Sequence, residues 1–165
     1  MHVTAHLSLA TAALALVLSA CSPSADNAQS AAAETAAATP APAHALTLED
    51  LPAPYNEADL AAGRNAFTRC AACHTLDEGA PDRMGPNLHT VFHRKPGSKP
   101  GFRYSESMKA LAASTPLETW TPEELDKWLQ DPAGYLPGSA MTFNGISDPE
   151  ARRDLIAWLM IDTSH

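Results

Sequence analysis

The sequence has few basic residues, few cysteines and no long apolar run. Lysine and arginine number 11 against 19 aspartate and glutamate residues, so the formal net charge is −8. A nucleic-acid partner is therefore not expected, because phosphate binding needs a basic surface. The apolar run at residues 7–18 is shorter than the roughly 20 residues of a membrane-spanning helix. The alternating pattern of β-strands is also missing, so the fold is expected to be all-α.

The N-terminal residues resemble the signal of a bacterial lipoprotein. The apolar run at residues 7–18 fits the central region of a secretory signal peptide. It ends in Leu18-Ser19-Ala20-Cys21, and small residues before a lone cysteine resemble a lipobox. We therefore expect residues 1–20 to be a signal peptide and Cys21 to carry a lipid anchor, on the periplasmic side of a bacterial membrane. The alternative is an ordinary signal peptide, with Cys21 as a spare thiol.

An alanine- and proline-rich segment follows, at residues 21–45. After Cys21 it contains no bulky apolar side chain. Such a segment cannot bury enough surface to offset the entropy of ordering, so we expect a disordered tether. Residues 46–165 remain, which are enough for one small domain with a modest core of its own. A large buried cofactor would supply part of that core.

The most informative residues are Cys70-Ala71-Ala72-Cys73-His74. Two thiols three residues apart, with an imidazole directly after the second, form the attachment signature of a c-type haem. The alternatives are a redox-active dithiol and half of a zinc site. A redox pair usually follows a strand, and a zinc site needs two further ligands at matching spacing. The chain has only three cysteines, and the third is the distant Cys21.

Capping and helix-breaking residues predict about four helices in the domain. The expected helices span residues 57–70 (capped by Asn56), 105–112, 122–131 and 147–160. Thr121 and Glu124 form a capping-box pattern at the start of the third helix. Gly63 lies inside the first helix and suggests that another helix crosses closely there. Residues 75–103 are rich in proline and glycine, and they are expected to form a long loop that wraps around something.

The domain resembles the class I cytochromes c, in particular the mitochondrial-type branch. The resemblance covers residues 56–159 and rests on the haem signature and a series of further motifs in the family's order. These are Gly85-Pro86-Asn87-Leu88-His89, Arg94-Lys95, Pro100-Gly101-Phe102, Tyr104, Trp120, Tyr135-Leu136-Pro137-Gly138, Met141 and Arg153-Asp154-Leu155-Ile156-Ala157-Trp158-Leu159. It implies a handful of helices around one buried haem. It also implies that the first and last helices cross, with Gly63 and Phe67 against Leu155 and Trp158.

The resemblance also implies the residues that hold the haem. Cys70 and Cys73 would bind it covalently, and His74 and Met141 would be the two axial ligands of its iron. The Pro86 carbonyl would accept a hydrogen bond from the His74 ring, and the propionates would be met by Arg94, Tyr104, Trp120 and Ser139. Met84, Met108 and Met160 are the other methionines that compete with Met141 for the iron. Met108, Trp128 and an insertion around residues 112–119 depart from the family's pattern.

A His/Met pair fills both axial positions of the iron and leaves no open site for a substrate. We therefore expect an electron-transfer protein rather than an enzyme, a monomer that shuttles single electrons between redox proteins at the membrane. One alternative is a haem subunit of a larger oxidase, reductase or dehydrogenase. A haem peroxidase or gas sensor is the other, and it would require Met141 to leave the iron.

Overall fold

The computed structural model describes residues 45–164. The predicted signal peptide, Cys21, the tether up to residue 44 and His165 lie outside the described residues. All regular structure in the described range is helical, which confirms the prediction of an all-α fold. None of the helices in this range is long and apolar enough to cross a membrane.

The first helix, α1, spans Leu60–Ala71 and begins later than its predicted start at residue 57. Its N-cap is Asp59, whose side chain accepts hydrogen bonds from the backbone N–H groups of Ala61 and Ala62 at 2.9 and 3.0 Å. The prediction of Asn56 as the cap is therefore wrong. Residues Tyr55–Glu57 form a separate 3-10 turn, η2, after a first one, η1, at Leu48–Asp50. The Asp59 carboxylate satisfies two otherwise unpaired N–H groups and fixes where the α-helix starts.

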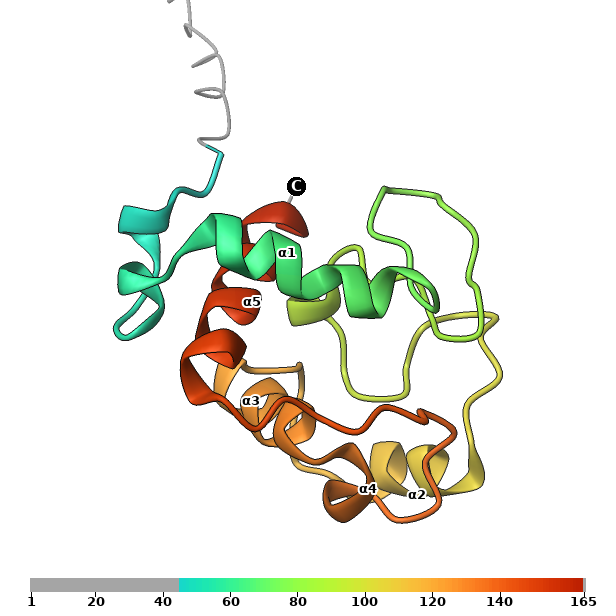
Figure 1. Cartoon of the computed structure of the whole chain (residues 1–165). Helices are drawn as coiled ribbons and strands as arrows, with labels where there is room; N and C mark the ends of the chain where they lie inside the picture. Colours follow the sequence, from blue (N-terminus) through green and yellow to red (C-terminus); the bar gives the residue numbers. More distant parts are fainter. Residues whose placement is uncertain (1–44, 165) are drawn as a thin grey trace, which may run out of the picture. The chain divides into compact units, whose positions relative to one another are not determined.

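The last helix, α5, spans Pro149–Asp162 and crosses α1 (Figure 1). Its N-cap is Asp148, one residue after the predicted Ser147. A Cβ atom placed on Gly63 would lie 2.9 Å from Trp158 Cβ and would collide with the backbone carbonyl of Asp154. The rings of Phe67 and Trp158 are 5.1 Å apart. The predicted crossing is thus confirmed, with the Asp154 backbone and Trp158 as the closest neighbours of Gly63.

Three further helices lie between these two in the sequence. They are α2 at Glu106–Ser114, α3 at Pro122–Gln130 and α4 at Pro132–Tyr135. Thr121 caps α3 as predicted, through a 3.2 Å hydrogen bond from the Glu124 N–H. The Glu124 carboxylate instead accepts hydrogen bonds from Lys127 and Tyr135. The four-residue α4 was not predicted, because it is too short to show a helical period.

The predicted long loop connects α1 to α2 and contains one 3-10 turn, η3, at Val91–His93. Backbone hydrogen bonds attach this loop to the elements around it. The N–H of Gly85 donates to the carbonyl of Cys73 at 2.9 Å, and that of Thr90 donates to the carbonyl of Thr163 at 3.1 Å. The loop is therefore fastened to the end of α1 and to the residues after α5, and it forms one side of a cavity.

Candidate functional site

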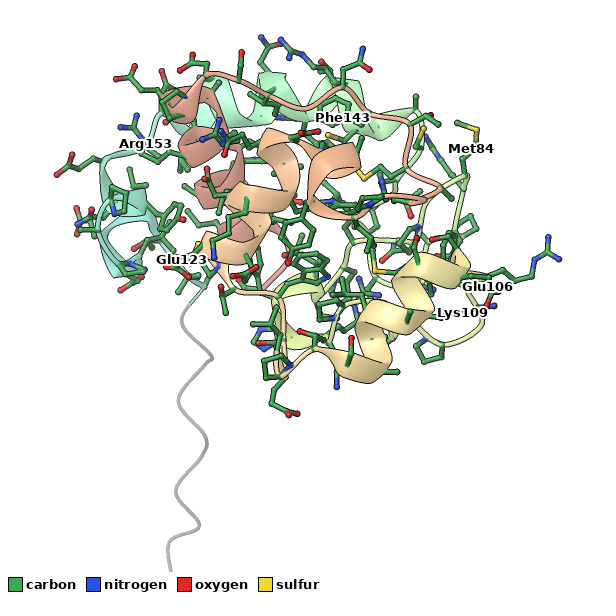
Figure 2. All side chains as sticks on the ribbon, turned by 90° about the horizontal axis from the view of Figure 1, so that it is seen from below. Met84, Glu106, Lys109, Glu123, Phe143 and Arg153 are labelled. Atoms are coloured by element: carbon green, nitrogen blue, oxygen red, sulfur yellow. The ribbon has the colours of Figure 1, made fainter. Side chains whose placement is uncertain are left out.

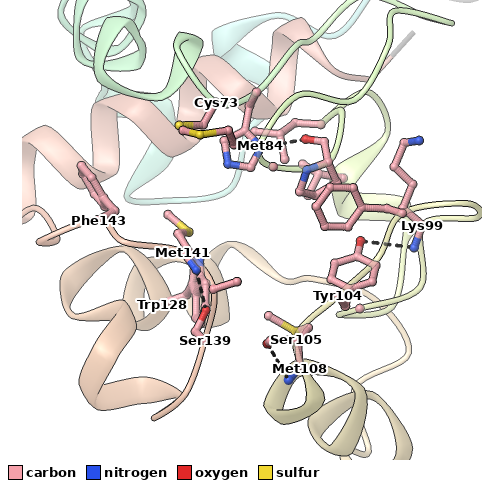
Figure 3. A pocket seen from close by; sticks show the side chains of 18 of the residues that line it. Cys73, Met84, Lys99, Tyr104, Ser105, Met108, Trp128, Ser139, Met141 and Phe143 are labelled. Carbon is pink, nitrogen blue, oxygen red and sulfur yellow. Dashed lines mark hydrogen bonds between the residues drawn. The ribbon is translucent and has the colours of Figure 1, made fainter.

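A cavity of about 540 Å³ is enclosed by the end of α1, the long loop, α2, α3 and the residues after α4. Figure 3 shows its interior. The structure brings together all the predicted site residues that it describes. Those that line the cavity are Cys70, Cys73, His74, Pro86, Arg94, Tyr104, Trp120, Ser139 and Met141. Residues far apart in the sequence thus share one pocket, as the binding of a large ligand requires.

The two thiols lie at the C-terminal end of α1 and are not joined to each other. The N–H groups of Cys73 and His74 both donate to the carbonyl of Cys70 at 2.9 Å, so the three residues form one tight turn. Burial raises the pKa of the Cys70 thiol to about 11. This buried thiol is therefore not a reactive thiolate at pH 7.

His74 is held in a defined orientation beside the thiols. Its Nδ1 lies 2.7 Å from the carbonyl oxygen of Pro86, and because a carbonyl only accepts, Nδ1 must carry the proton. Burial lowers the pKa of His74, against the opposing effect of this hydrogen bond. The ring is therefore neutral at pH 7 and keeps a lone pair on Nε2, which is the form that binds a metal.

Gly85 makes this arrangement possible, a role that sequence reasoning missed. A Cβ atom at this position would lie 2.7 Å from both ring nitrogens of His74 and would collide with Cε1 between them. Only a residue without a side chain can pass so close to the imidazole. The glycine of Gly85-Pro86-Asn87 was visible in the sequence, but nothing in the sequence shows which ring it faces.

Thioether side chains lie across the cavity from Cys73. Figure 3 shows Met141 and Met108 reaching into the cavity from the side opposite Cys73. Met141 follows the turn at Gly138, and its N–H donates to the Ser139 hydroxyl at 3.2 Å. Met108 comes from α2 and is only 8% exposed.

The other two methionines are placed differently. Met84 is 78% exposed and extends outward at the rim of the cavity (Figure 2). Met160 lines a separate cavity.

One end of the cavity is basic. The charged residues that line the cavity are all cationic: Arg94, Lys95, Lys99 and Arg103 belong to the long loop and form this end, and Arg69 lies beside Cys70 on α1. Arg94 donates through Nη2 to the carbonyl of Asn87 at 2.8 Å, but its buried Nε has no partner in the part of the chain described. Burial lowers the pKa of Arg94 and raises that of Tyr104, whose hydroxyl accepts from the Lys99 N–H at 3.3 Å. An unpaired buried donor among cations fits an anionic group of a ligand.

The residues present therefore fit a haem. Two thiols and a neutral imidazole lie at one side, thioethers lie opposite, and the basic end can meet two propionates. Among residues 45–164, no three His, Cys, Asp or Glu side chains gather into a metal-binding group, so the zinc alternative gains no support.

Known proteins resemble the chain over the same region. The family model described as Cytochrome c matches residues 60–161. A cytochrome c of Stellaria longipes is 41% identical over 110 residues, which cover 66% of this chain and 97% of the relative. A cytochrome c2 of Agrobacterium tumefaciens (strain II Chrys) is 41% identical over 108 residues, covering 66% of this chain and 96% of the relative. The range of the family match, residues 60–161, includes all the cavity-lining site residues named above.

Proposed function

The chain belongs to the cytochrome c family, and we propose that it is a one-electron carrier whose haem iron is bound between His74 and Met141. The family implies a covalently bound haem c and electron transfer rather than enzymatic catalysis. When bound, the haem supplies a one-electron couple, and a thioether ligand favours its reduced state. The axial pair is the more specific part of the proposal.

One observation carries the axial pair: a neutral imidazole and a thioether lie in one cavity, on either side of the space that a flat ligand would fill. Cys70 and Cys73 would hold the haem through thioether bonds. The Pro86 carbonyl orients His74, and the short hydrogen bond raises the basicity of its Nε2. Met108, Leu125 and Trp128, which are all buried, exclude water from the cavity wall.

The basic end of the cavity would hold the propionates. Arg94 offers its unpaired Nε, while Tyr104, Trp120 and Ser139 line the same cavity with polar groups of their own. Pairing matters here because a buried carboxylate without partners is costly. These residues therefore help to retain the cofactor and do not exchange electrons themselves.

We also propose, from the sequence, how the carrier is delivered and retained. Residues 1–20 would be a lipoprotein-type signal peptide, Cys21 the lipidated residue, residues 21–45 a tether and residues 46–165 the haem domain. The protein would then face the periplasm as a monomer. Its tether would keep the domain at a high effective concentration near redox partners on the same membrane.

Visible spectra of the oxidised and reduced holoprotein test the function. The expected result is a low-spin spectrum in both states, with a weak long-wavelength sulfur-to-iron band in the ferric form. The colour should stay with the polypeptide after acid denaturation and extraction with organic solvent, because thioether bonds survive this treatment. Extraction of the colour would contradict covalent attachment, and a high-spin spectrum would contradict the axial pair.

A further inference from the structure

The hydrogen bonds around His74 extend one residue beyond the contacts used so far, to Asp82. We propose that Asp82 is a positioning residue that tunes His74 through the peptide group between Pro86 and Asn87. The inference rests on the proposed role of His74 as an iron ligand. The Asp82 carboxylate does not line the cavity. Its ion pair with Lys99 was not predicted from the sequence.

Both ends of one peptide group are engaged. The Pro86 carbonyl accepts from His74 Nδ1 at 2.7 Å. The N–H of Asn87 belongs to the same planar unit and donates to Asp82 Oδ1, also at 2.7 Å. Hydrogen bonds in such a chain polarise one another, so a carboxylate at the N–H end increases the negative charge on the carbonyl oxygen. The Asp82 charge thereby strengthens the hydrogen bond that His74 donates.

The surroundings keep Asp82 charged and the peptide group fixed. The hydrogen bond from the Asn87 N–H is the main cause that holds the pKa of Asp82 below its ordinary value, and the charges of Lys99 and Arg94 lower it further. Lys99 Nζ lies 2.9 Å from Oδ1 and 3.0 Å from Oδ2 of the same carboxylate.

Asn87 itself is anchored on its other sides. Its side-chain amide donates to Thr75 Oγ1 at 2.8 Å and to the carbonyl of Asp77 at 3.0 Å, and its own carbonyl accepts from Arg94. A change at Asp82 or Lys99 should therefore alter the polarisation of the peptide group more than its position.

Two substitutions distinguish this relay, in which the Asp82 charge polarises the peptide group, from an ion pair that only holds the loop in position. Asp82→Asn keeps an oxygen that can accept from Asn87 but removes the charge, so the His74–Pro86 hydrogen bond should weaken. Lys99→Met leaves the Asp82–Asn87 bond in place and removes the cation that offsets the carboxylate, so the same hydrogen bond should strengthen. A more basic His74 stabilises the ferric state, so the two variants should move the reduction potential in opposite directions.

The experiment uses the full-length holoprotein with 15N-labelled histidine, in the diamagnetic ferrous state. In Asp82→Asn, exchange of the His74 Nδ1 proton with solvent should be about tenfold faster than in the wild type, and the potential should rise. In Lys99→Met the exchange should be no faster than in the wild type, and the potential should fall. Glu106→Gln and Lys109→Met break the exposed ion pair on α2, seen at the surface in Figure 2, and should leave the exchange unchanged.

Each contrary result has a distinct meaning. Faster exchange in both variants would show that the ion pair only holds the loop in position and does not polarise the peptide group. Shifted reduction potentials with unchanged proton exchange would show that the Asp82 charge acts on the haem through space and not through the peptide group. Each of these two results overturns the proposed relay. If Asp82→Asn does not fold, accelerated exchange in Lys99→Met alone overturns it. A wild-type spectrum without a histidine-ligated haem would instead overturn the proposed function, and the relay with it.

Discussion

Several residues at this site contact His74 or Met141 directly: Gly85 and Pro86 contact His74, and Ser139 contacts Met141. The haem signature was identified from the residues themselves, whereas Met141 was named as a ligand through the resemblance to the class I cytochromes c. The contacts of Gly85 and Asp82 were not predicted, because they depend on how the loop at residues 75–103 folds against itself and against His74. A loop without a period gives no sequence signal of which residues meet. The orphaned Nε of Arg94 could likewise be found only in the structure.

Gly85→Ala should displace the His74 ring. The added methyl group would collide with the imidazole, while the backbone at this position is not in the left-handed region, so any effect comes from crowding. We expect a loss of about 1–3 kcal/mol in the free energy of unfolding, measured with denaturant on the holoprotein, together with an altered spectrum. Gly79→Ala is the control: open space surrounds Gly79, but its φ of +69° disfavours alanine, so the variant should lose stability without a change in the spectrum.

Met141→Ala should remove the sixth ligand. The expected result is loss of the sulfur-to-iron band, a lower reduction potential and rapid binding of added cyanide or carbon monoxide. Met108→Leu is the matched control, since Met108 also lines the cavity and should leave the band in place. An unchanged spectrum in Met141→Ala, with loss of the band in Met108→Leu, would make Met108 the ligand.

At the scale of elements, the type of each long helix was predicted correctly and the starts were less certain. Asn56 and Ser147 are good capping residues, yet Asp59 and Asp148 cap α1 and α5. Several such residues stand close together in both places, so capping propensity alone does not decide which of them begins the helix. The crossing of α1 and α5 was anticipated from Gly63, because a glycine inside a helix is costly unless something approaches closely.

Gly63→Val tests that crossing. The nearest atoms are backbone atoms of Asp154, which cannot move aside like the end of a flexible side chain. We therefore expect a loss of about 3 kcal/mol in the free energy of unfolding, despite the poor helix propensity of glycine. Ala62→Val, on the exposed side of α1, should cost less than about 1 kcal/mol. A gain in stability for Gly63→Val would contradict the close approach.

The whole molecule combines a negative net charge with a weakly charged rim around the cavity. Residues 46–165 carry a net charge of −6. The cationic residues Lys95, Lys99 and Arg103 line the cavity at its basic end. The exposed residues Ala72, Ala140 and Thr142 in the segments near the cavity are small and uncharged, and Met84 adds an apolar side chain, while Arg69 and Arg83 are the exposed charges of the same segments. The net charge is read from the sequence alone, whereas this uneven distribution depends on the fold.

Electron exchange with the physiological partner should consequently depend little on salt. Screening acts over about 10 Å at 0.1 M salt, and in the segments that we expect to face a partner, residues 69–74, 83–88 and 137–145, the charged side chains are Arg69 and Arg83. We expect stopped-flow rates to change by less than about threefold between low and moderate ionic strength. Ala72→Lys combined with Ala140→Lys should introduce a clear salt dependence. A steep fall with salt in the wild type would reveal a charged docking surface elsewhere.

Cys21→Ser tests membrane attachment. If Cys21 carries the lipid, the variant should be released into the soluble fraction or fail to mature, whereas the wild type should need detergent. Serine keeps the size of the side chain but cannot form the thioether. Recovery of the wild-type protein in the soluble fraction after cell disruption without detergent would end the lipoprotein proposal.

The packing of α1 against α5 also has a consequence for the order of events during biogenesis. α1, which contains Cys70 and ends two residues before Cys73, packs against α5, the last helix of the chain to be synthesised. Contacts between such distant parts of a chain form late, since the intervening segment must first be brought together. Until that packing forms, we expect Cys70 and Cys73 to be more accessible than in the folded protein. We therefore expect haem attachment to come before the final packing of α1 against α5.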